Sequence, residues 1–85
     1  MIDRPARDQL SRNLRLLISG KITNDQFEDG TPASNEDAAI MAFADMAWLL
    51  YSDMKEHHLV GHYSIGPGDR REVVRWILFL DSERT

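Results

Sequence analysis

Three histidines lie close together in the second half of the sequence: His57, His58 and His62. His58 and His62 are four residues apart, the spacing at which two histidines on one helix face bind zinc. No glutamate lies between them to act as the base of a metalloprotease, and Gly61 makes a continuous helix unfavourable here. A metal-binding protein that uses these three side chains is therefore an alternative interpretation. The other is that histidines near a helix end contact its free carbonyl groups.

A group of basic residues lies near the C-terminus beside Trp76: Arg70, Arg71 and Arg75. Arginines next to an aromatic ring are one pattern of single-stranded nucleic-acid binding. Acidic residues interleave with these arginines, and the chain carries a net charge of −4. Because nucleic-acid-binding domains are usually basic, we expect a solvent-exposed helix face here and no nucleic-acid partner.

The sequence contains no recognisable catalytic arrangement. It has no cysteine nucleophile and no Ser/His/Asp pattern in a familiar context. Gly66-Pro67-Gly68 is a turn rather than a phosphate-binding loop, because proline lacks the N–H donor that such a loop needs. We therefore expect no enzymatic activity, no cofactor and no small-molecule substrate.

Length and composition indicate one small domain over residues 1–85. The absence of cysteine favours a reducing compartment, and the N-terminus carries charges where a signal peptide needs apolar residues. The longest apolar run, Ala38 to Ala44, is seven residues, far below the ~20 that span a bilayer. We expect a cytoplasmic protein with no membrane contact.

Charge is distributed unevenly along the chain. Residues 1–21 contain five basic and two acidic residues, whereas residues 22–58 contain one basic and eight acidic residues. Residues 59–85 contain four of each. The simplest interpretation is a basic first helix lying near an acidic middle segment within one fold.

The first half of the sequence predicts a long helix and a short one. Apolar residues at helical spacing predict a helix from Arg4 to Ser19, which Gly20 ends. Thr23 and Gln26 fit a capping box, which predicts a short helix after Thr23. The turn over residues 29–32 would stop that helix.

The second half predicts two further helices and a loop. Ser34 is the expected start of a helix that reaches Met54 or Lys55, and Pro67 is the expected first residue of the last helix. Residues 56–68 should form a loop held by three apolar side chains: Leu59, Tyr63 and Ile65. The fold class is therefore all-α, a compact bundle of three main helices plus one short capped helix.

Both later helices have more apolar residues than one buried face can use. A chain this short buries only about 60–65% of the surface that it exposes when unfolded. We therefore expect exposed apolar clusters that form a homodimer interface or a groove for a partner helix. The expected interface residues are Met46, Trp48, Leu49, Leu78 and Phe79. Alternatively, the short helix and the 56–68 loop cover these second faces.

Two stretches, residues 20–29 and 69–80, together with Tyr51-Ser52-Asp53, resemble a family of small uncharacterised bacterial proteins. The resemblance implies a bacterial cytoplasmic origin and supplies no activity, cofactor or site residue.

The leading functional hypothesis is a small non-catalytic interaction or regulatory module that self-associates through apolar helix faces. The alternatives are the metal-binding protein described above and an accessory subunit of a larger enzyme or of a toxin–antitoxin-like complex.

Overall fold

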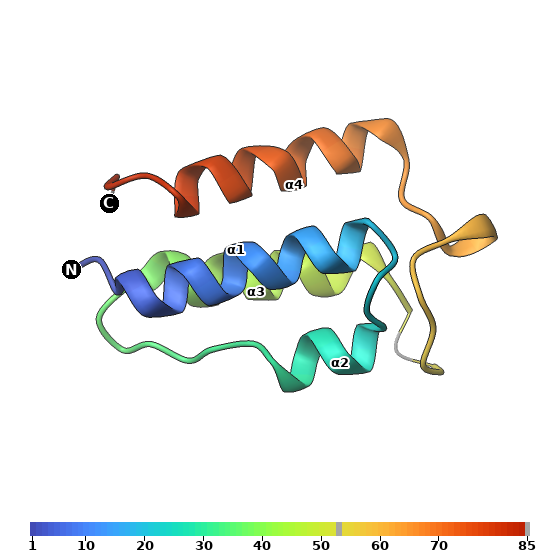
Figure 1. The fold of residues 1–85 in the computed structure, drawn as a ribbon, viewed down its shortest axis with the longest axis horizontal. Coiled ribbons are helices and arrows are strands. Elements are labelled where there is room, and N and C mark those ends of the chain that lie inside the picture. The colour runs from blue at the N-terminus through green and yellow to red at the C-terminus, as the bar shows by residue number, and fades with distance from the viewer. Residues whose placement is uncertain (53, 85) are drawn as a thin grey trace.

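The computed structural model describes residues 1–52 and 54–84, and within these residues it contains helices and no strand. The elements in chain order are α1 (Arg4–Ile18), α2 (Asn24–Asp29), α3 (Ala38–Ala47), the 3-10 turns η1 (Trp48–Leu50) and η2 (Gly61–Tyr63), and α4 (Pro67–Leu80). Helix α1 packs against α2, α3 and α4, and it runs antiparallel to α4 (Figure 1). The all-α bundle of three main helices and one short helix is confirmed.

Helix α1 begins and ends close to its expected positions. The Asp3 side chain caps its start by accepting from the backbone N–H of Ala6 at 3.2 Å. Gly20 follows its last turn with a φ of +75°, a conformation that favours glycine. A Cβ atom built on Gly20 would lie 2.3 Å from the Val60 side chain, so this turn also brings the two segments into close approach.

Helix α2 starts with the predicted capping box. The Thr23 hydroxyl accepts from the Gln26 backbone N–H at 3.1 Å, and the Gln26 side chain accepts from the Thr23 backbone N–H at 2.9 Å. These two bonds satisfy donors that the first turn of a helix leaves free. Phe27 is fully buried, so this short helix contributes a large ring to the core.

Helix α3 is shorter than the sequence predicts. It begins at Ala38 rather than Ser34, and it ends at Ala47 rather than at Met54 or Lys55. Asp37 is the N-cap residue, because its carboxylate accepts from the backbone N–H of Ala39 at 3.3 Å. The predicted helix also crossed Asp53, which lies outside the described residues.

The early end of α3 follows from a contact with α2. The fully buried Asn24 side chain donates to the carbonyl oxygens of Ser52 and Lys55, and it accepts from the His57 backbone N–H at 2.9 Å. Tyr51, which precedes these groups, is extended with φ −150° and ψ 167°, so the chain has left helical geometry before Ser52. Tertiary hydrogen bonding therefore replaces the helix that the local apolar pattern favours.

The segment after α3 is a loop, as expected, and it leads into α4 at Pro67. Leu59 is buried, and Tyr63 and Ile65 are half-buried. An isolated antiparallel bridge joins Thr23 to His58. The loop is thus attached to the start of α2 as well as to the core.

The core lies between α1, α3 and α4. Its buried side chains from the three long helices include Leu10, Leu14, Leu17, Ile40, Ala47, Val73, Ile77 and Leu80. None of the helices in the described part of the chain has the length and apolar character needed to cross a membrane.

Candidate functional site

The three histidines do not gather at one point. The His57 ring nitrogen Nδ1 lies 2.9 Å from the Lys55 carbonyl oxygen, and the His58 Nδ1 lies 2.9 Å from the Gly20 carbonyl oxygen. Ring contacts join Tyr63 to His57 at 4.2 Å and to His62 at 4.1 Å between centroids. Residues 1–52 and 54–84 contain no group of three or more histidine, cysteine or acidic residues that could hold a metal ion.

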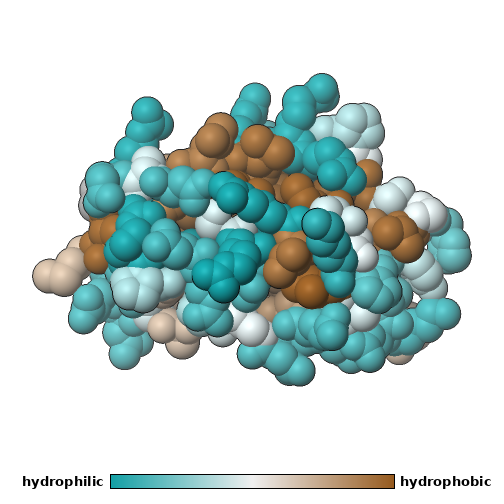
Figure 2. Space-filling model, in the orientation of Figure 1, coloured by the Kyte–Doolittle hydropathy of each residue, from teal (hydrophilic) through white to brown (hydrophobic). Residues whose placement is uncertain are grey.

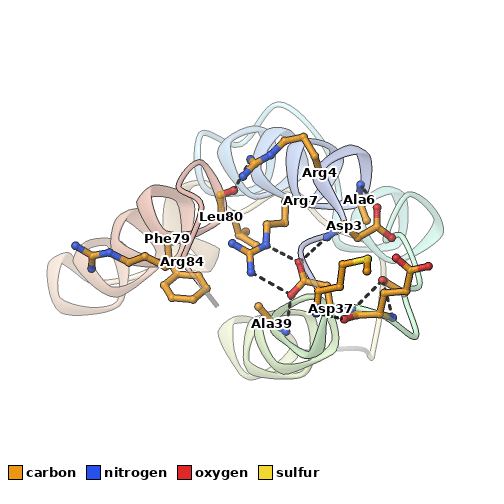
Figure 3. Close-up of polar contacts among 12 residues, drawn as sticks. Asp3, Arg4, Ala6, Arg7, Asp37, Ala39, Phe79, Leu80 and Arg84 are labelled. Carbon is orange, nitrogen blue, oxygen red and sulfur yellow. Dashed lines mark hydrogen bonds and ion pairs between the residues drawn. The ribbon is translucent and has the colours of Figure 1, made fainter.

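A buried ion pair joins α1 to the start of α3. Arg7 is fully buried, and its Nε and Nη2 atoms donate to the two carboxylate oxygens of Asp37 at 2.5 and 3.1 Å. Figure 3 shows the Arg7 side chain reaching from α1 toward this carboxylate. Because every contact of the pair lies within the fold, we assign it a structural role.

Hydrogen bonding explains the protonation state of this pair. The bond from Arg7 lowers the pKa of Asp37 from 3.8 to about 2, and two backbone N–H groups add to this effect against the opposing effect of burial. The same bond raises the pKa of the Arg7 guanidinium. Both groups are therefore charged at neutral pH.

The position of Arg7 in the sequence indicates that it is buried and needs an acidic partner. Arg7 precedes Leu10 by three residues and Leu14 by seven, so it lies on the apolar face of α1. A lone arginine on such a face needs a buried acidic partner. Asp37, the N-cap residue of α3, supplies this carboxylate.

Polar side chains of α1 also bind the C-terminal end of α4. The Arg4 guanidinium donates to the Leu80 carbonyl oxygen at 2.8 Å and to the Ser82 carbonyl oxygen. The Ser11 hydroxyl donates to the Asp81 carboxylate at 2.8 Å. Because carbonyl groups at a helix end lack intrahelical partners, these contacts fix α4 against α1.

Apolar side chains lie exposed at the end of α3 and in η1. Three of the expected interface residues belong to this group: Met46, Trp48 and Leu49, which are 37%, 53% and 85% exposed. Met41, one to two turns earlier on α3, is also exposed. We call Met41, Asp45, Met46, Trp48 and Leu49 the α3 surface.

The outer side of α4 is also apolar in part. Leu78 is 64% exposed, and Val74, one turn before it, is exposed as well. Figure 2 shows hydrophobic atoms gathered over α4 along the upper edge of the molecule. These two side chains are spaced four residues apart and therefore lie on one face of the helix.

Phe79, the fifth expected interface residue, is half-buried and packs inside the molecule. Its ring contacts Phe43 of α3 at 5.5 Å between centroids, and the Arg7 guanidinium lies 5.1 Å from its centre. Phe79 therefore packs against side chains inside the fold, and it also lines a hollow at the molecular surface.

Two open hollows follow the outer side of α4. One, of about 520 Å³, is lined by Arg75, Leu78, Phe79, Ser82 and Arg84. The other, of about 460 Å³, is lined by Pro67, Arg70, Arg71, Val74 and Arg75. They share Arg75, so they form one continuous surface along α4, and we call it the α4 surface.

The α4 surface differs in charge from the rest of the chain. All charged residues that line the two hollows are arginines. The α4 surface combines cations with apolar side chains. The loop with the three histidines and the buried pair of Arg7 and Asp37 make contacts within the fold instead. The exposed surfaces of α3 and α4 are therefore the candidate functional site.

Comparison with known protein families, with curated proteins and with solved structures finds no match to this chain. The geometry and chemistry of the α3 surface and the α4 surface therefore provide the evidence for function.

Proposed function

We propose that this protein is a small non-catalytic interaction module that forms a homodimer through exposed apolar helix faces. The interface we propose contains Met46, Trp48, Leu49, Leu78 and Phe79. The observation that supports it most directly is the exposure of Trp48, Leu49 and Leu78 in so small a chain. Large exposed apolar clusters of this kind are typical of association sites.

The chemistry of these residues suits an interface. Tryptophan is among the residues that most often dominate binding energy, because its large ring loses much water contact on association. Leu49 adjoins Trp48 in η1, so one partner surface covers both. The proposal includes a bacterial, cytoplasmic setting, which the lack of cysteine and the family resemblance favour.

The experiment compares three proteins by size-exclusion chromatography with light scattering at micromolar concentration. The wild-type chain should have twice the monomer mass of 9.8 kDa. Trp48→Gln combined with Leu49→Gln should weaken dimerisation at least tenfold, as expected for the loss of a central aromatic anchor. Met54→Gln is the matched control, since Met54 is 93% exposed outside both surfaces.

Thermal melting of each variant separates lost association from lost folding. The exposed side chains contribute little to the monomer core, so surface substitutions should change monomer stability by at most about 0.5 kcal/mol. A wild-type protein that stays monomeric throughout the micromolar range overturns the proposal. So does a Trp48→Gln/Leu49→Gln variant that dimerises as tightly as the wild type.

A further inference from the structure

The α4 surface carries positive charge that the fold only partly uses. Arg75 pairs with Glu72 at 2.8 Å, and Arg70 donates to the Ile18 carbonyl oxygen at 3.2 Å. Arg71 makes no hydrogen bond or ion pair with any residue that the structure describes. Exposed Val74 lies between Arg71 and Arg75 along the helix, and exposed Leu78 lies one turn beyond Val74. A ligand for this surface therefore needs apolar groups with negative charge beside them.

The α3 surface has the opposite character. Asp45 is the sole charged residue in the sequence between Ala38 and Leu50, and it is exposed among Met41, Met46 and Trp48. The last turn of α3 contains no basic residue. Because the carbonyl groups at a helix C-terminus carry partial negative charge, this end of α3 attracts cations.

Trp48 adds a specific attraction for arginine. Its indole ring is half-exposed at the C-terminal end of α3. Tryptophan is the aromatic ring with the strongest cation–π attraction, and arginine is its most frequent cationic partner. An arginine from α4 of another molecule would meet the ring, the Asp45 carboxylate and the helix end together.

We propose that the α4 surface of each molecule binds the α3 surface of the other, so that a two-fold dimer contains two identical contacts between unlike surfaces. This inference rests on the proposed self-association and specifies how the surfaces pair. A contact of α4 with α4 would bring Arg71 and Arg75 of two copies together, and like charges facing each other across an interface oppose association. A contact of α3 with α3 would leave these arginines without a partner.

The pairing is tested with two variants that each lose one surface. Arg71→Glu with Leu78→Gln disables the α4 surface, and Trp48→Gln with Leu49→Gln disables the α3 surface. Each variant alone should be monomeric, since every contact between unlike surfaces then lacks one side. An equimolar mixture should form a 1:1 heterodimer, because one intact α4 surface meets one intact α3 surface.

Native mass spectrometry and sedimentation velocity measure the outcome. The control variant, Arg12→Glu with Met54→Gln, makes the same kinds of change at exposed residues outside both surfaces. It should dimerise within about twofold of the wild type, as expected for changes outside an interface. Circular dichroism melting of every variant verifies that each one is folded before mixing.

The possible results separate this inference from the proposed function. If the wild type dimerises and either variant still dimerises alone, a contact between like surfaces is correct and our pairing is wrong. If both variants are monomeric and the mixture forms no heterodimer, the pairing is also wrong, although self-association stands. If the wild type is monomeric, both the pairing and the proposed function fail.

Discussion

At the scale of single residues, the buried pair of Arg7 and Asp37 decides how α1 meets the start of α3. Asp37 accepts from Arg7, from the backbone N–H of Asp3 and from that of Ala39. Each carboxylate oxygen thus has two donors. Such a pair adds little net stability compared with apolar residues, but it becomes costly when one partner is removed.

Replacement of Arg7 by methionine should therefore lower the free energy of unfolding by about 3–5 kcal/mol, since the Asp37 carboxylate would be buried without its cation. Urea denaturation followed by circular dichroism measures the change. Arg12→Met, on the exposed side of α1, is the control and should change stability by at most about 0.5 kcal/mol. Equal stability of the two variants would refute a structural role for the pair.

Acid should remove the contribution of Asp37. Its pKa is about 2 in the folded protein, below its ordinary value of 3.8. A lowered folded-state pKa stabilises the protein above the unfolded-state pKa, and this stabilisation disappears as the pH falls through the folded-state pKa. The contribution is on the order of 2 kcal/mol.

Unfolding free energies measured from pH 5 down to pH 2 should therefore fall more steeply for the wild type than for Asp37→Asn. The variant lacks the titrating carboxylate and starts from a lower stability at pH 5. Parallel curves for the two proteins would show that Asp37 has no shifted pKa.

At the scale of elements, hydrogen bonds from α2 determine where the next helix ends. Asn24 contacts three backbone groups of the loop that follows α3. Since the short helix α2 is held in turn by its capping box and by buried Phe27, the local sequence of α2 controls the shape of a segment about thirty residues away.

Asn24→Ala should free that loop. It leaves the buried His57 N–H without its acceptor, which costs about 1–3 kcal/mol. The backbone amide of His57 should exchange its hydrogen faster in this variant. The core amides of α1 should exchange faster only by the factor that the loss of global stability predicts. Unchanged exchange at His57 would contradict the account. Asp25→Ala, at the exposed position next to Asn24 and outside the capping box, is the control.

Sequence patterns predicted some elements well and others poorly, for physical reasons. The capping box of α2 and the proline at the first position of α4 depend on contacts within a few residues. Both helix starts could therefore be predicted from the sequence. The end of α3 depends on Asn24, and its start depends on Arg7 binding Asp37, which are contacts between distant segments. The exposed apolar residues at 48, 49 and 78 followed from apolar excess, and the exposed face of Arg70, Arg71 and Arg75 followed from their grouping in the sequence. Only the continuity of this surface as far as Arg84 required the fold.

At the scale of the whole molecule, two surfaces of different chemistry are left exposed by a small helical core. One is apolar with a negative helix end, and the other is apolar with arginines. A chain of 85 residues has few elements with which to cover both. Association is therefore the simplest way for the surfaces to lose contact with water.

Salt should weaken this association in a predictable way. Because arginines meet a carboxylate and a helix end across the proposed interface, raising the salt concentration from low to about 0.5 M should weaken dimerisation several-fold. Sedimentation equilibrium at two salt concentrations measures the change. An interface that is purely apolar would instead bind equally well or more tightly in salt.

Self-association is tested most directly by the mass of the wild-type protein across a dilution series in analytical ultracentrifugation. We predict a reversible change from twice 9.8 kDa at high micromolar concentration toward 9.8 kDa on dilution. A mass of 9.8 kDa at every concentration, with the combined fluorescence of Trp48 and Trp76 independent of dilution, would show that the protein does not self-associate.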